Sequence, residues 1–198
     1  MHVRSRSSLT PKRFALPFPG SPSLSALLTC FRPMFDFTST SPDPASAWRN
    51  VDDPVMGGVS ESTFEATDDG AAFTGTVSLK QGGGFASVRA PEADYDLSTH
   101  DGLRLRLRGD GKRYWFTAYT AAGGSVSYRL PLHPATEWTT VRVPFAELTP
   151  YRRGTKMPDA PAFDPSQVRT LGFLIADEQD GPFRLEVAWI RAGLDAAS

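Results

Sequence analysis

A strict alternation of leucine and arginine at residues 103–108 constrains the fold of this chain more than any other feature. These six residues read Leu-Arg-Leu-Arg-Leu-Arg. Successive side chains of a β-strand point to opposite faces, so a strand here places the leucines on one face and the arginines on the other. Antiparallel sheets with one buried and one solvated face have this pattern. The segment therefore predicts a strand of an antiparallel sheet.

Turn residues and further short strands follow the same pattern over most of the chain. Gly109-Asp110-Gly111 is predicted to form a hairpin turn, and residues 114–120 a second strand with Trp115, Thr117 and Tyr119 on one face. We expect further strands at 71–79, 85–89, 125–130, 139–144, 170–176 and 183–190, and helical turns at 144–148 and 164–168. At least eight short strands among 17 glycines and 17 prolines predict an all-β fold, a β-sandwich of jelly-roll type.

Composition excludes several classes of partner. With 21 basic and 22 acidic residues, the net charge of −1 provides no field that favours nucleic acid or an anionic membrane. No apolar run approaches the length of about 18 residues that a transmembrane helix needs, so no membrane span is expected. Cys30 is the single cysteine, which rules out an internal disulfide and a cysteine-rich metal site.

The first 35 residues differ from the rest because they contain five basic residues and no acidic one. A mitochondrial transit peptide has this composition, whereas Pro17, Pro19 and Pro22 interrupt the apolar core that a secretory signal needs. The third interpretation is an unfolded extension from a start codon assigned too early, with Met34 as the true start. We adopt it, and expect an extension at 1–35, a β-sandwich at 36–192 and a tail at 193–198.

Catalytic and cofactor motifs are absent from the sequence. The three histidines form no metal-binding pair, and no Gly-x-Ser-x-Gly elbow occurs. The glycine cluster at 82–84 lacks the Lys-Ser/Thr of a phosphate-binding loop, and after residues 109–112 Arg113 stands where that loop needs a hydroxyl. Acidic groups at 52–53, 68–69 and 177–180 fit turns better than calcium ligands, although a structural calcium stays open. We expect no enzyme activity, no cofactor and no catalytic metal.

The arginine face of residues 103–108 is the candidate contact surface. We expect it to include Arg129, Arg142 and the Arg184/Glu186 pair, with aromatic side chains between them. Such a face can hold a carbohydrate, an anion or a protein, since arginine and aromatic residues are enriched at interfaces. The alternative is an ordinary solvated sheet face covered by long basic side chains. The candidate residues are Arg104, Arg106, Arg108, Trp115 and Tyr119.

Residues 48–62 read Trp-x-x-Val-Asp-Asp-Pro-Val-Met-Gly-Gly-Val-Ser-x-Ser, which is similar to the signature of the complex I intermediate-associated protein 30 family. The resemblance covers roughly residues 35–192. Where the family usually has Asn-Asp, this chain has Asp52-Asp53. Further motifs follow in order at 73–79, 83–89, 101–103, 107–111, 138, 144–145, 153–154, 171–173 and 181–185.

The resemblance implies a galactose-binding-like β-sandwich without a defined catalytic residue. Mitochondrial members of the family assist the assembly of respiratory complex I as chaperones and are not part of the finished enzyme. It implies a non-enzymatic assembly factor that binds proteins, respiratory-complex subunits among them. The alternative is a module that binds carbohydrate or a small ligand. Because the family also has bacterial members, the expected compartment is the cytoplasm, with the mitochondrion as the alternative.

The two glycine segments of the signature are expected to lie together. We predict that a tight loop in the first segment packs against the second segment, because clustered glycines permit close approach. This loop is a structural motif with a candidate function. Its residues are Asp53, Met56, Gly57, Gly58 and Ser60, and those of the second segment are Gly83, Gly84 and Phe85.

Overall fold

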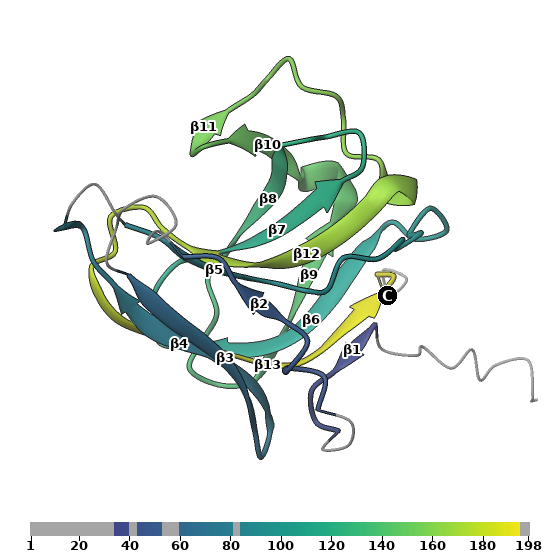
Figure 1. Ribbon diagram of the computed structural model, residues 1–198. Coiled ribbons are helices and arrows are strands. Elements are labelled where there is room, and N and C mark those ends of the chain that lie inside the picture. The colour runs from purple at the N-terminus through teal and green to yellow at the C-terminus, as the bar shows by residue number, and fades with distance from the viewer. Residues whose placement is uncertain (1–33, 40–42, 53–59, 81–83, 195–198) are drawn as a thin grey trace, which may run out of the picture. The chain divides into compact units, whose positions relative to one another are not determined.

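Two antiparallel β-sheets enclose the core in a computed structural model of the protein (Figure 1). The structure describes residues 34–39, 43–52, 60–80 and 84–194. Within these ranges regular structure consists of strands and two short 3₁₀ turns, η4 (Phe145–Glu147) and η5 (Pro165–Gln167). The expected all-β class is therefore confirmed. No helix of the described ranges is long and apolar enough to cross a bilayer.

The six-stranded sheet has the order β3-β4-β13-β6-β9, and β1 also pairs with β13. Its strands are β1 (Phe35–Asp36), β3 (Glu61–Thr67), β4 (Gly70–Val77), β6 (Gly102–Gly109), β9 (Thr139–Pro144) and β13 (Gly181–Ala192). The seven-stranded sheet has the order β11-β10-β8-β7-β12-β5-β2. Its strands are β2 (Arg49–Asn50), β5 (Ala86–Arg89), β7 (Tyr114–Thr120), β8 (Ser127–Leu132), β10 (Thr149–Arg152), β11 (Thr155–Lys156) and β12 (Val168–Ile175).

Alternation along each strand builds the core between the sheets. Leu103, Leu105 and Leu107 of β6 are at most 1% exposed, as the leucine–arginine pattern predicts. From the other sheet, β7 contributes Tyr114 and Phe116, which are equally buried. Each large apolar side chain that is fully buried stabilises the fold by roughly 1.5–3 kcal/mol, so this shared layer is the main source of stability.

Irregularities in two central strands keep their apolar side chains in phase with this layer. In β13 the register shifts between Val187 and Trp189. As a result Val187 and Ile190, three positions apart, are both fully buried, although a regular strand would turn them to opposite faces. A similar shift between Val168 and Thr170 in β12 lets Val168 and Leu171 share the core.

Trp48 joins the two sheets through an aromatic cluster. Its ring centroid lies 5.0 Å from that of Phe64 in β3 and 6.1 Å from that of Phe173 in β12. Phe35 and Phe37 contact the same indole at 5.1 and 5.5 Å. The cluster thereby anchors the first described residues to both sheets.

The connection between β6 and β7 differs from the expected hairpin. β6 pairs with β13 and β9, whereas β7 pairs with β12 and β8, so residues 110–113 cross from one sheet to the other. The physical reason is that both strands carry a fully apolar face, and the two faces meet across the core. The polar faces of β6 and β7 consequently point in opposite directions.

Two motif glycines allow neighbouring strands to approach closely. A Cβ atom on Gly172 of β12 would lie 2.0 Å from the Val88 carbonyl oxygen, and one on Gly75 of β4 would lie 2.1 Å from the Glu61 carbonyl oxygen. Real Cβ atoms do not approach that closely, so these positions require glycine for packing between strands.

Glu186 of β13 is a buried carboxylate held by two arginines of the same sheet face. It accepts hydrogen bonds from Arg108 Nη2 and Nε at 2.6 and 3.0 Å and from Arg184 Nε at 2.5 Å. Burial alone would raise the pKa of Glu186, but the hydrogen bonds and charges of Arg108 and Arg184 outweigh it and lower that pKa below its usual value.

Replacing Gly172 with alanine is expected to destabilise the protein by about 2 kcal/mol or more, because the methyl group forces β12 and β5 apart. The measurement is the free energy of unfolding in urea. Gly111→Ala is the comparison, since a Cβ there meets nothing within 4 Å and only the positive φ of 85° opposes it. That variant should lose about 1 kcal/mol. Equal losses in the two variants would contradict the close-packing role.

Glu186→Gln is expected to lower the free energy of unfolding by about 1–2 kcal/mol at neutral pH, because charge-assisted hydrogen bonds become neutral ones. The folded-state pKa of Glu186 lies below the unfolded one, so its contribution is present above pH 4.5 and is lost as pH falls through the folded value. Unfolding measured from pH 7 to pH 3 should show the wild type and the variant converging at low pH. Parallel curves would contradict the prediction.

Candidate functional site

Only part of the glycine-rich signature at residues 48–62 lies within the described ranges. Ser60 is fully buried, and its hydroxyl oxygen accepts a hydrogen bond from the Ser78 amide at 3.0 Å. Gly84 has a φ of 136°, in the range that favours glycine, and Phe85 is half-buried. The predicted packing of the two segments stays a prediction, because the other residues named for it lie outside the described ranges: Asp53, Met56, Gly57, Gly58 and Gly83.

Asp52, which begins the acidic pair of the signature, links the two sheets. Its carboxylate accepts hydrogen bonds from Ser62 Oγ of β3 at 2.7 Å and from the Ser87 amide of β5 at 3.2 Å. The preceding Val51 carbonyl accepts from Ser87 Oγ at 2.6 Å. Hydroxyl and amide donors thus contact this carboxylate. Among the described residues no cluster of three metal-ligating side chains occurs.

The arginines of β6 lie on the outer face of the six-stranded sheet, where Arg108 and Arg104 contact neighbouring groups of the protein. Arg108 is paired with Glu186, and its guanidinium lies 4.7 Å from the Trp138 ring. Arg104 donates to the Gly193 carbonyl at 3.1 Å. Cα register places Arg142 and Arg191 on either side of Arg104. Arg142 and the Arg184/Glu186 pair therefore belong to this face, as expected.

Trp115 and Tyr119 do not join them. They belong to β7 and lie on the outer face of the seven-stranded sheet, with Arg129 of β8. The single contact face expected from the sequence is thus divided between two sheets, because the turn after β6 crosses the core. The aromatic side chains instead meet arginines from other strands.

On the seven-stranded sheet, Cα register aligns four strands in one row. Arg129 of β8 faces Thr117 of β7, which faces Gly172 of β12, which faces Arg89 of β5. Arg49 of the edge strand β2 continues the row. Since Gly172 has no side chain and threonine is short, the centre of the row is low and long arginines stand at both of its ends.

Aromatic rings pack against the guanidinium groups of Arg89 and Arg129. The Arg89 guanidinium carbon lies 4.2 Å from the Tyr119 ring centroid, and that of Arg129 lies 5.2 Å from the Tyr151 centroid. Trp115 contacts Tyr151 with ring centroids 5.6 Å apart. All five side chains are half-buried. We call Arg89, Trp115, Tyr119, Arg129 and Tyr151 the arginine–aromatic face.

The orientation of Trp115 is fixed by an acidic turn. Its Nε1 donates a hydrogen bond to Asp177 Oδ2 at 2.7 Å, and Arg113 pairs with the same oxygen at 2.9 Å. Asp177 has a φ of 63°, which is uncommon for a residue other than glycine. The strained turn therefore places its carboxylate on Trp115 and Arg113.

The two arginines of this face have no carboxylate partner among the described residues. No ion pair is formed by Arg89 or Arg129 within that part of the chain, and the Nε of Arg89 is buried without a hydrogen-bond partner there. Burial lowers the pKa of Arg129, and the positive charge of Arg89 acts in the same direction, against the raising effect of Tyr119, Tyr151 and Asp177. Arg89 and Arg129 are thus half-buried on this face without an ion pair among the described residues, and Asp177 is the carboxylate whose charge acts on Arg129.

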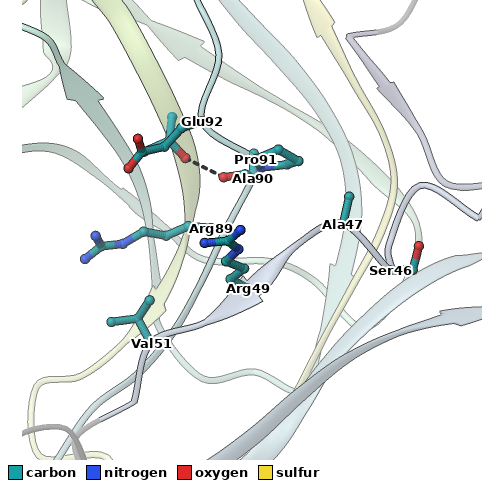
Figure 2. A pocket seen from close by; sticks show the side chains of 9 residues that line it. Ser46, Ala47, Arg49, Val51, Arg89, Ala90, Pro91 and Glu92 are labelled. Atoms are coloured by element: carbon teal, nitrogen blue, oxygen red, sulfur yellow. Dashed lines mark hydrogen bonds between the residues drawn. The ribbon is translucent and has the colours of Figure 1, made fainter.

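A hollow of about 720 Å³ adjoins this face at the β2 edge of the sheet. Figure 2 shows Arg49 and Arg89 extending beside it, and its dashed line is the 2.8 Å hydrogen bond from Thr170 Oγ1 to the Ala90 carbonyl. The remaining lining residues are Ser46, Ala47, Val51, Pro91 and Glu92. The hollow extends the positively charged surface towards the signature segment.

Sequence reasoning missed Arg89 and Tyr151 as members of this face. Arg89 ended a strand that was expected, but the neighbour of that strand was unknown. Tyr151 lies in β10, which was not expected, and Pro150 beside it argued against a strand. Only the pairing of β8 with both β7 and β10 brings Tyr151 to Arg129.

Comparison with known sequences gives one family. A sequence model described as complex I intermediate-associated protein 30 matches residues 35–187. The chain is 27% identical over 190 residues to the Drosophila melanogaster protein named "Complex I intermediate-associated protein 30, mitochondrial", covering 81% of this chain and 64% of the relative. It is 26% identical over 173 residues to the Mus musculus protein of that name, covering 76% and 53%. The chain thus spans less than two thirds of either relative.

Among solved structures, the chain is similar to a family 11 carbohydrate-binding module from Clostridium thermocellum in complex with a mixed-linked tetrasaccharide. The TM-score is 0.55 at 16% identity, covering 74% of this chain and 89% of the module. An agarase, AgWH50C, gives a TM-score of 0.55 at 15% identity, covering 82% of this chain and 26% of the enzyme. These similarities confirm the predicted galactose-binding-like, jelly-roll β-sandwich. By the match over residues 35–187, the chain belongs to the complex I intermediate-associated protein 30 family.

Proposed function

We propose that the protein is an assembly factor that binds partly assembled respiratory complex I and is absent from the finished complex. The observation that carries this proposal is the family match over residues 35–187. The names of the Drosophila and mouse relatives support it. A binding role, in place of a catalytic one, is in line with that naming.

The arginine–aromatic face is the surface we assign to the partner. Arginine, tyrosine and tryptophan dominate the binding energy of protein interfaces, and the two aromatic residues bury large areas at low entropic cost. Here the Asp177 contact fixes Trp115, and ring stacking holds Arg89 and Arg129. Such ordered side chains lose little freedom on binding, which favours affinity.

The cellular compartment of the protein is inferred from its proposed partner, complex I. Both relatives carry the word mitochondrial in their names, which supports the mitochondrial alternative. Neither name supports the cytoplasmic expectation. We therefore place the protein where its source cell assembles complex I.

Deleting the gene is expected to lower the amount of fully assembled complex I several-fold and to leave smaller intermediates. Native gels of respiratory membranes, probed for complex I subunits, measure this. Re-expression of the wild-type chain should restore assembly, and the chain should migrate with the intermediates and not with the finished complex. Normal levels of complex I after deletion would refute the proposed function.

Carbohydrate binding is a second candidate function, favoured by the half-buried, outward-facing rings of the arginine–aromatic face on a fold shared with carbohydrate-binding modules. If it is correct, a glycan array should give a positive ligand, and Trp115→Ala should weaken its binding about tenfold, the loss expected when one stacked ring is removed. Trp189→Ala, on the other sheet, is the matched control. An array without ligands, or equal loss in both variants, would contradict this candidate.

A further inference from the structure

Both outer faces carry arginines without an ion pair among the described residues, but the two faces arrange these arginines differently. On the six-stranded sheet, Glu186 pairs with Arg108 and Arg184, while Arg106, Arg142 and Arg191 form no ion pair with the described residues. On the seven-stranded sheet, the described residues supply no carboxylate to Arg89 or Arg129, and Asp177 is directed to Arg113 and Trp115. Arg89 and Arg129 differ from the arginines of the six-stranded sheet because they stand at the two ends of one row, with only Gly172 and Thr117 between them.

The geometry points to an acidic, extended segment of a partner protein as the ligand of the arginine–aromatic face, with its carboxylates on Arg89 and Arg129. This inference rests on the proposed assembly function and names the chemistry of the partner. Planar guanidinium groups bind carboxylates through two parallel hydrogen bonds. Because Arg129 Nε already donates to Ser127 Oγ at 2.8 Å and Arg89 Nε is buried, the terminal nitrogens Nη1 and Nη2 are the donors assigned to the carboxylates.

The spacing of the two arginines suits an extended peptide. β5 and β8 are separated in the sheet by β12 and β7, so three strand spacings of about 4.8 Å place their backbones about 14 Å apart. In an extended peptide, side chains four residues apart lie about 13 Å apart on the same side. Gly172 and Thr117 keep the surface between the arginines low, so a backbone can lie across it.

The same observations favour a protein over a nucleic acid. The net charge of the chain is −1, whereas surfaces that bind nucleic acid are strongly positive. Aromatic and arginine side chains with few lysines are the composition of protein interfaces. Charge complementarity therefore selects an acidic peptide.

The test uses the full chain and a fluorescein-labelled hexaglutamate peptide, with binding measured by fluorescence anisotropy. We expect binding that weakens with added salt, and at least about tenfold weaker binding of a hexaglutamine peptide. The double variant Arg89→Gln/Arg129→Gln should weaken hexaglutamate binding by about tenfold or more. The matched control Arg106→Gln/Arg142→Gln removes the same charge from the other sheet and should bind as the wild type does. Because residues 1–35 also carry five basic and no acidic residues, only the difference between the double variants counts.

A measurement on the wild-type protein avoids dependence on the folding of variants. Hexaglutamate should shift the NMR signals of the Nε–H groups of Arg89 and Arg129 and leave that of Arg106 unchanged. The inference is overturned by equal loss in the two double variants, by unshifted Arg89 and Arg129 signals, or by tighter binding of an oligothymidylate. It also fails if the Arg89→Gln/Arg129→Gln chain restores complex I assembly fully in deleted cells, an outcome that leaves the assembly function intact.

Discussion

The apolar layer shared by the two sheets is the constraint on which the rest of the structure depends. Every long strand must present its large side chains to this layer, and the outer faces receive whatever remains. Where β12 and β13 would lose phase with the core, a register shift restores it. Core packing therefore decides which side chains lie on the outer faces. Tyr128 and Val88 are buried in the core, so Arg129 and Arg89, which follow them in their strands, point outward.

Strands with strong alternation could be predicted from the sequence. The limits predicted for the strand at 114–120 agree with the structure, and so do those at 139–144. β3 was missed because Phe64 is its one buried residue, and β10 was missed because it contains Pro150 and has no buried residue. Strand prediction depends on alternating apolar residues that face the core. β3 and β10 have almost no such residues.

The candidate site was harder to predict than the fold because it depends on pairing between strands. Trp115, Tyr119 and Arg129 are recognisable as outward-facing side chains of strands, but nothing local shows that β7 lies on the sheet opposite β6. Nor does local sequence show that Arg89 reaches Tyr119 across β12. Register and strand order arise from long-range packing, so the residues of this face are far apart in the chain, from 89 to 151.

The two outermost strands of the seven-stranded sheet, β2 and β11, contain two residues each. Proteins that capture peptides by β-augmentation offer a long free edge whose backbone groups pair with the incoming strand. Such edges also recruit misfolded chains indiscriminately. With so little backbone available at the described edges, the proposed recognition on this sheet relies on side chains. The proposed recognition of unfinished subunits therefore depends on their charge pattern and not on pairing with an exposed strand.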